Sequence, residues 1–210
     1  MNSTPAPKKA TRRNDPEGLR RRVLDAASSL FQARGYHATS MQDLMQATAV
    51  TGGALHHHFP TKKSLVLAVF EERVAPAVRE AWIEPIRTSS SLGEGIALAF
   101  GRIADGIEAR AAVTGCPLNN LALELALDDP AFRQAASAIF TEWQEAIVER
   151  LRDTEGGRGL SEAARAEAAT FVVASYSGAM ALAKTEQSAR ALRETANSLL
   201  AWLQARRLDR

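Results

Sequence analysis

Apolar residues recur at helical spacing along most of this chain. Residues 18–33 carry one apolar stripe, formed by Val23, Ala27, Leu30 and Phe31. A glycine often ends a helix, so we expect this helix to stop at Gly35. No segment alternates apolar and polar residues with a period of two, the pattern of a half-buried strand. The pattern therefore predicts an all-α fold without a β-sheet.

Residues 39–70 predict two short helices and the start of a third. Thr39 can serve as the N-cap of the first helix, with Gln42 three residues later as in a capping box. Thr51 can cap the second helix, which ends before Pro60 because the residue before a proline avoids helical geometry. Thr61 caps the next helix. This order is typical of a helix-turn-helix unit, whose second helix enters the DNA major groove.

The second short helix begins with Gly52 and Gly53. Each glycine costs a helix about 1 kcal/mol relative to alanine, and close approach of a partner to the backbone is the usual reason to keep one. Leu55 and Phe59 lie four residues apart and are expected to face inward. The outward positions are then Thr51, Gly52, His56 and His57.

The rest of the chain predicts six further helices and their boundaries. They are expected over residues 62–74, 91–112, 117–127, 130–153, 161–184 and 187–207, with an end or kink at Pro76 and a junction marked by Trp82, Pro85 and residues 89–91. Asp129 and Pro130 form an N-cap and a first-turn proline. The glycine-rich residues 156–159 predict a break, and Ser161 is expected to cap the helix that follows. The last two helices carry wide stripes of small and apolar residues, which indicate either a four-helix bundle between two subunits or burial within one chain.

Composition adds a charge asymmetry. The chain has 210 residues, 46% hydrophobic and 24% charged, which suits one or two globular domains. Residues 1–63 hold ten Lys and Arg against four Asp and Glu, whereas the remainder has a net charge of −4 within a total of +2. A basic front end with an acidic body predicts a polyanion contact confined to the front.

Residues 1–16 read as a flexible basic arm, which either touches DNA or only aids solubility. One cysteine permits no disulfide within the chain, as suits a reducing cytoplasm. The N-terminus lacks an apolar signal segment, and no run approaches 18 apolar residues, so we expect neither export nor a membrane span.

Residues 18–70 resemble the DNA-binding domain of the TetR family of bacterial transcriptional regulators. The resemblance rests on Leu24-Asp25-Ala26-Ala27, Leu30-Phe31, Arg34-Gly35-Tyr36, Thr39-Ser40, Gly53-Ala54-Leu55, His58-Phe59 and Lys62. The chain departs from the family at His56, where a tyrosine that often contacts phosphate is usual. The resemblance implies an all-helical homodimer whose variable C-terminal domain binds a small ligand and pairs the subunits.

The resemblance also implies which residues meet DNA. The helix over residues 51–58 would lie in the major groove, and the expected DNA contacts are Thr39, Ser40, Thr51, Gly52, Gly53, His56, His57 and Lys62. The expected domains are the arm over 1–16, the helix-turn-helix domain over 17–63, and a ligand-binding and dimerisation domain over 64–210.

A second block, residues 115–125, places two amides and a carboxylate in an apolar helix. Buried polar groups need partners, so this block is either a capped helix start with Asn119 or Asn120 bonding the backbone, or the wall of a ligand pocket. In the second interpretation Cys116, Asn120 and Glu124 face a cavity. Residues that could complete the pocket, each also acceptable as ordinary core, are Phe100, Ile103, Ile107, Phe132, Phe140, Trp143, Tyr176 and Met180.

Cys116 itself leaves two alternatives. A helix N-terminus lowers the pKa of a thiol and favours the reactive thiolate, so Cys116 could sense electrophiles. Cysteine also behaves as a small buried hydrophobe, so it could simply line an apolar pocket.

Metal and enzyme chemistry are not expected. His56, His57 and His58 are consecutive helical residues, which point about 100° apart and cannot close on one ion. No positioned nucleophile, acid–base pair or phosphate loop is present, so we expect no cofactor.

The sequence predicts a cytoplasmic, homodimeric regulator, a repressor that leaves a palindromic double-stranded DNA operator when a small-molecule effector binds. The alternative is an all-helical ligand-binding adaptor that does not bind DNA.

Overall fold

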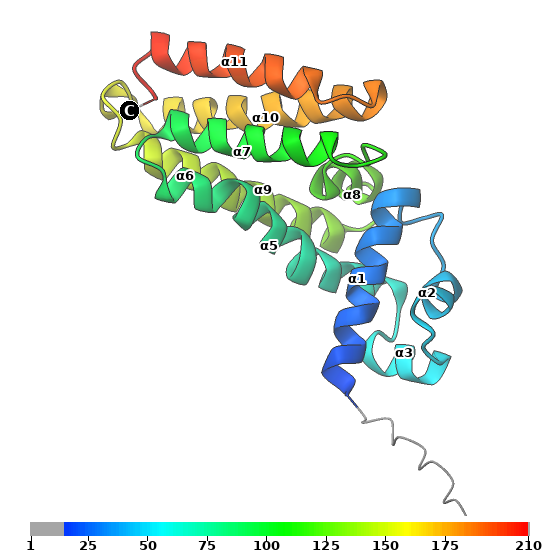
Figure 1. Ribbon diagram of the computed structural model, residues 1–210. Coiled ribbons are helices and arrows are strands. Elements are labelled where there is room, and N and C mark those ends of the chain that lie inside the picture. Colours follow the sequence, from blue (N-terminus) through cyan, green and yellow to red (C-terminus); the bar gives the residue numbers. More distant parts are fainter. Residues whose placement is uncertain (1–14, 210) are drawn as a thin grey trace, which may run out of the picture.

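The computed structural model describes residues 15–209, and all of its regular elements are helical. The expected all-α fold class is confirmed, since no strand occurs in that range. Figure 1 shows α1, α2 and α3 grouped at one end of the molecule, beside a larger helical bundle. The basic arm expected over residues 1–16 lies outside the described residues, apart from Asp15 and Pro16.

The smaller unit consists of α1 (Pro16–Arg34), α2 (Met41–Thr48), α3 (Gly52–His58) and the start of α4 (Lys62–Val69). Asp15 caps α1, so this helix begins two residues earlier than the sequence suggested. Gly35 ends it with a φ of 91°, a backbone conformation that favours glycine. The core of the unit is formed by Leu24, Ala27, Phe31, Leu44, Leu55, Phe59 and Leu65.

The N-cap of α2 is Ser40, and the expected cap at Thr39 is wrong. The Thr39 side chain is fully buried, and its hydroxyl donates to the carbonyl of Gly35 at 2.8 Å. That bond uses the hydroxyl on the preceding turn, so the helix begins one residue later. Asp43 completes the capping box in place of Gln42, because its carboxylate accepts the Ser40 N–H at 2.6 Å.

A long, nearly continuous helical rod leads from the smaller unit into the larger one. It runs through α4, the π-helix η1 (Phe70–Val74), α5 (Ala75–Val78), the π-helix η2 (Arg79–Ile83) and α6 (Glu84–Thr88). Each π turn directly precedes a segment whose second residue is proline, Pro76 in α5 and Pro85 in α6. A proline lacks the N–H and crowds the carbonyl four residues before it, and a wider turn relieves both problems.

The helix therefore does not end near Pro76. The break comes at residues 89–91, after α6. Trp82, expected at a junction, is instead buried within the rod's packing face. Two prolines suggested interruptions in the sequence, whereas the π turns keep the chain helical through both of them.

The remaining helices match the sequence prediction to within a few residues. They are α7 (Leu92–Glu108), α8 (Pro117–Leu125), α9 (Pro130–Leu151), α10 (Glu162–Glu186) and α11 (Arg190–Ala205), with a short 3-10 turn, η3 (Gly157–Gly159), in the expected glycine-rich break. Asp129 and Ser161 cap α9 and α10 as predicted. In the larger bundle, α10 packs against α9 and α11, and α11 packs against α7.

The stripe expected to pair two subunits is mostly buried inside one chain. Ala179, at its centre, is only 3% exposed. The other buried members of the stripe are Ala168, Val172, Ala196, Leu199 and Leu203. On α10, Phe171 and Leu182 remain open, at 45% and 53% exposure. Burial within the protomer thus accounts for the small residues, and the outward apolar surface is narrower than the sequence suggested.

Helix α10 is also long and apolar enough to cross a bilayer, judged by length and composition alone. The sequence interpretation had found no such segment. Within the described structure, 44% of that apolar window is buried. The core helix of a globular protein passes the same test, so this one helix is weak evidence for a span.

Candidate DNA-binding surface and ligand pocket

Helix α3 presents one face to solvent and is anchored by the other. Thr51 caps it as predicted, and its hydroxyl oxygen accepts the N–H of Ala54 at 3.4 Å. Leu55 and Phe59 are buried in the core of the smaller unit. The exposed positions on α3 are Gly53, His56 and His57.

The two glycines of α3 are not required by the protein's own packing. A Cβ at Gly53 would meet no atom within 4 Å, and one at Gly52 would meet only the Met45 sulfur, at 3.4 Å. Neither residue has a positive φ. Since both positions could hold a side chain and gain helix stability, their glycines point to a surface that an external partner approaches closely.

The expected phosphate contacts around α3 differ in their availability. Ser40 is exposed, although its hydroxyl is bonded to Asp43. The buried Thr39 hydroxyl has no free surface, so the expected contact through it is corrected. The Lys62 ammonium lies over the Tyr36 ring, 4.0 Å from its centroid. Desolvation in this position lowers the pKa of Lys62.

Among the three consecutive histidines, His56 contacts the backbone, whereas His57 and His58 contact each other. His56 Nδ1 lies 3.3 Å from the carbonyl oxygen of Pro60. The rings of His57 and His58 meet edge to face, with centroids 5.3 Å apart. Within residues 15–209, no group of three or more His, Cys, Asp or Glu side chains is arranged to hold a metal ion.

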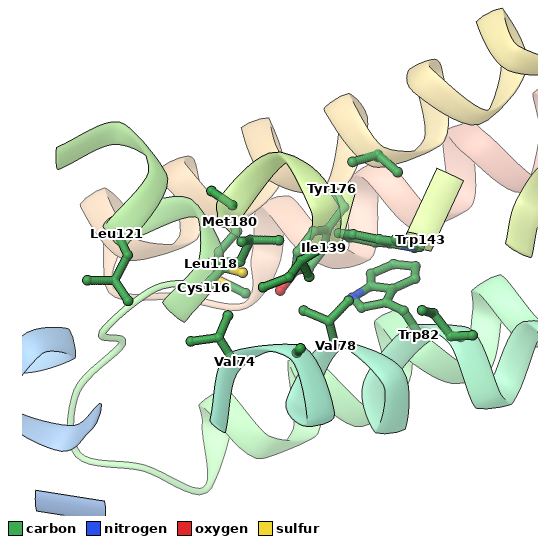
Figure 2. Packing of buried hydrophobic residues seen from close by; sticks show 14 of the residues in the cluster. Val74, Val78, Trp82, Cys116, Leu118, Leu121, Ile139, Trp143, Tyr176 and Met180 are labelled. Carbon is green, nitrogen blue, oxygen red and sulfur yellow. The ribbon is translucent and has the colours of Figure 1, made fainter. Parts of the chain in front are cut away.

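The larger unit contains a cavity of about 480 Å³ with a largely apolar wall. Six residues that the sequence proposed for a pocket line it: Ile103, Ile107, Cys116, Trp143, Tyr176 and Met180. Figure 2 shows Val74, Val78 and Trp82 on the opposite wall, facing Cys116 and Leu118. These three were missed, although their spacing of four residues marks one helical face. The π turns that keep the face continuous could not be read from the sequence.

Other expected pocket residues lie elsewhere. Phe100 packs behind the cavity, with its ring centroid 5.2 Å from Trp82 and 5.8 Å from Tyr176. The Asn120 amide donates to the carbonyl of Thr114 at 2.8 Å, which is the capped helix start of the alternative interpretation. Among the further candidates, Phe132 and Phe140 are also absent from the lining.

Glu124, which the sequence placed in the pocket wall, lies elsewhere in the structure. Its carboxylate accepts the backbone N–H of Tyr36 at 2.9 Å and of His37 at 2.7 Å. It therefore holds the turn between α1 and α2 and does not line the cavity. A polar residue in an apolar helix indicated that some partner was needed, but the sequence could not show that the partner was a backbone turn nearly 90 positions away.

Cys116 lines the cavity and is buried. Burial raises the pKa of its thiol, although the N–H groups of Asn119 and Leu118 and a hydrogen bond with the Tyr176 hydroxyl act in the opposite direction. The expectation that the helix N-terminus lowers the pKa of this thiol is therefore wrong, because the effect of desolvation is larger than that of the hydrogen bonds. The position favours the pocket-lining alternative over the reactive sensor.

The rim of the cavity is polar and includes a residue of the smaller unit. Arg102, Arg110 and Glu80 lie on it together with Gln32 of α1. The Gln32 amide donates to the carbonyl of Gly115 at 2.8 Å. One edge of the pocket is therefore built on α1, the helix that also packs against α2 and α4.

Two family models match the chain. Residues 23–69 match the model described as bacterial regulatory proteins, tetR family, and residues 93–198 match the C-terminal domain of LmrA/YxaF-like transcriptional regulators. The chain belongs to the TetR family. The first match covers the helix-turn-helix unit, and the second covers most of the helices around the cavity, from α7 to α11.

Individual TetR relatives agree with this assignment. The chain is 27% identical over 173 residues to the HTH-type transcriptional regulator LmrA of Bacillus subtilis, spanning 82% of this chain and 90% of LmrA. It is 24% identical over 181 residues to the HTH-type transcriptional repressor DhaR of a Mycobacterium species, spanning 81% and 84% of the two chains. A crystal structure of a TetR regulator from Chloroflexus aurantiacus superposes with a TM-score of 0.78 at 28% identity, covering 90% and 96% of the two chains.

The family membership settles the general function. The protein is a helix-turn-helix transcriptional regulator of the TetR family, whose members bind DNA operators and act as dimers. The predicted membership in the TetR family is confirmed, and the smaller unit is the DNA-binding domain of the protein.

Proposed function

We propose that this TetR regulator is a cytoplasmic repressor that leaves a palindromic operator when a small molecule occupies the cavity beside Cys116. The DNA-binding work falls to residues 17–63 and the ligand-binding and pairing work to residues 64–210. The observation that supports DNA binding is the exposed glycine turn at the start of α3. A Cβ at Gly53 would meet no atom within 4 Å, so the packing of the protein does not require a glycine there.

Each protomer would place α3 in the major groove. Gly52 and Gly53 let the DNA backbone come close, while His56 and His57 lie on the exposed face. Ser40 and Thr51 sit at the N-termini of α2 and α3, where backbone N–H groups favour phosphate. Lys62 would contribute a phosphate contact by leaving the Tyr36 ring, at the cost of the cation–π interaction.

The cavity supports the ligand half of the proposal. Its volume of about 480 Å³ falls in the range of small-molecule sites, and its inner wall is apolar with polar groups at the rim. The proposed effector contacts are Ile103, Ile107, Cys116, Trp143 and Tyr176. They come from four different elements, so a bound molecule would touch several helices at once.

Pairing of two subunits would use the outward apolar residues of α10 and α11. Phe171 of α10 packs against Trp202 of α11, with ring centroids 4.8 Å apart, and Leu182 of α10 is exposed as well. Two such surfaces would form the four-helix bundle through which the half-sites acquire a fixed spacing. The sign of regulation follows DhaR, which is named a repressor.

The experiment is selection of DNA from a random pool at low salt, followed by anisotropy measurements with the selected fragment. We expect a near-palindromic site with half-sites about one helical turn apart. We also expect the protein to lose its affinity for this site when a small molecule occupies the cavity. Failure to select any DNA sequence would overturn the proposal that the protein binds an operator and would favour the ligand-binding adaptor.

A further inference from the structure

Helix α8 joins the cavity to the DNA-binding domain. At its N-terminal end, Cys116, Pro117 and Leu118 lie in the cavity wall. At its C-terminal end, Glu124 holds the turn between α1 and α2. Eight residues of α-helix span about 12 Å, so one short rigid element touches both places.

The Glu124 carboxylate bonds the backbone of the turn, so the contact does not depend on the rotamer of any side chain in the turn. Its two carboxylate oxygens each accept one N–H, from Tyr36 and from His37. Gly35 permits this approach, since a Cβ there would lie 3.1 Å from both oxygens. The turn is therefore fixed in position relative to α8.

Neighbouring contacts extend from the same turn toward the DNA-binding surface. The Tyr36 ring meets Phe132 edge on, at 5.7 Å between centroids, and carries the Lys62 ammonium on its face. Desolvation lowers the pKa of Lys62, and the nearby Glu124 carboxylate opposes that shift. Glu124 thus contacts the Tyr36 backbone and also contributes to the charge environment of Lys62.

We propose that Glu124 is the positioning residue through which the cavity controls the DNA-binding domain. This inference rests on the proposed function. A molecule in the cavity displaces the 116–118 wall, α8 moves as a rod, and Glu124 moves the Tyr36–His37 turn with it. The turn sits between α1 and α2, so its displacement reorients α2 and α3 relative to the partner subunit's half-site.

The test uses a substitution in place of the unidentified effector. Gly106 lines the cavity, and a Cβ there meets no atom within 4 Å, so Gly106→Trp fills the space. Its matched control is Gly101→Trp on the same helix, where a Cβ also meets nothing but the position does not line the cavity. We expect Gly106→Trp to weaken operator binding about tenfold, within the usual range of allosteric coupling, and Gly101→Trp to leave it unchanged.

Coupling through Glu124 is then measured by a double-mutant cycle. Glu124→Gln turns one oxygen into an NH₂ group that opposes a backbone N–H. We expect Gly106→Trp to weaken binding less than about twofold in this background. Asp128→Asn is the matched control, because the Asp128 carboxylate pairs with the exposed His37 ring, at 2.8 Å, and not with the backbone of the turn, so this variant should preserve the tenfold effect. Equal weakening with and without Glu124→Gln would overturn the inference.

Hydrogen exchange provides a second readout that does not need DNA. The Tyr36 and His37 amides should exchange faster in Gly106→Trp than in the wild type, and Gly101→Trp should leave them unchanged. No change at these amides would overturn the inference even if operator binding responds. A wild type that binds no DNA would defeat the proposed function, while the exchange experiment would still decide whether the cavity reaches the turn. If Glu124→Gln lost its helical signal, Glu124→Asp, one methylene shorter, would replace it.

Discussion

The proposed DNA-binding surface and the proposed ligand cavity are built in opposite ways. The surface around α3 uses residues close in sequence, and a short buried anchor, Leu55 and Phe59, fixes their orientation. The cavity draws its wall from α7, α8, α9, α10 and the rod with its π turns. The first site needs only local caps and one apolar face, whereas the second exists only after distant helices pack. Changes in the two regions should therefore affect different properties.

The largest expected effect is on stability in the larger unit. Trp143 is fully buried between Trp82 and Tyr176, so Trp143→Ala should lower the free energy of unfolding by about 3–5 kcal/mol. Chemical denaturation measures this. Leu127→Ala, at a position 96% exposed, is the control and should stay within about 0.5 kcal/mol of the wild type. Similar losses in both variants would contradict the observed packing.

Gly53→Leu should separate the two regions most sharply. The structure has room for the side chain, so the free energy of unfolding should not fall. Operator affinity should drop by about 1–3 kcal/mol, comparable to a mismatched base pair, because the new side chain blocks the close approach of DNA. Anisotropy titration measures the loss. Gly101→Leu in α7 should leave the operator affinity unchanged, and an unaltered affinity in Gly53→Leu would remove the argument for α3 as the contact surface.

A smaller effect tests which residue starts α2. Ser40→Ala removes the capping hydroxyl and should cost about 1 kcal/mol of stability, read as a lower midpoint of thermal unfolding. Gln42→Ala tests the capping box suggested by the sequence and should have almost no effect. The opposite ranking would restore Thr39 and Gln42 as the cap.

The smallest effect concerns the ion pair between Arg20 of α1 and Glu72 of η1, which joins the two regions. The hydrogen bond from Arg20 lowers the pKa of Glu72. A carboxyl whose pKa is lower in the folded state stabilises the fold above its unfolded pKa of about 4.3 and loses that contribution as the pH falls. Glu72→Gln should therefore reduce stability at pH 7 but not at pH 2, by less than about 1 kcal/mol because the pair is partly exposed.

Denaturation at the two pH values measures the Glu72 contribution. Glu71→Gln is the control, since Glu71 makes no ion pair within residues 15–209. An equal loss at both pH values would mean that the Glu72 side chain contributes by packing and not by charge.

The sequence by itself determined the helix-turn-helix unit and most of the helices. Caps at Thr51, Asp129 and Ser161 act through bonds within three residues, so a local pattern is enough to locate them. The same holds for the outward glycines of α3. Even in this unit one predicted cap was wrong. The buried hydroxyl of Thr39 bonds the carbonyl of Gly35, and Ser40 caps α2 instead.

The tertiary structure alone decided what the polar and apolar residues of the larger unit do. Glu124 and Cys116 lie on one short helix, yet one holds a backbone turn in the DNA-binding domain and the other is buried with a raised pKa. The stripe around Ala179 was likewise divided between core and surface only by packing. Periodicity shows that a residue belongs to one face of a helix. The element against which that face packs depends on contacts between segments far apart in the chain, and these are fixed only when the whole core forms.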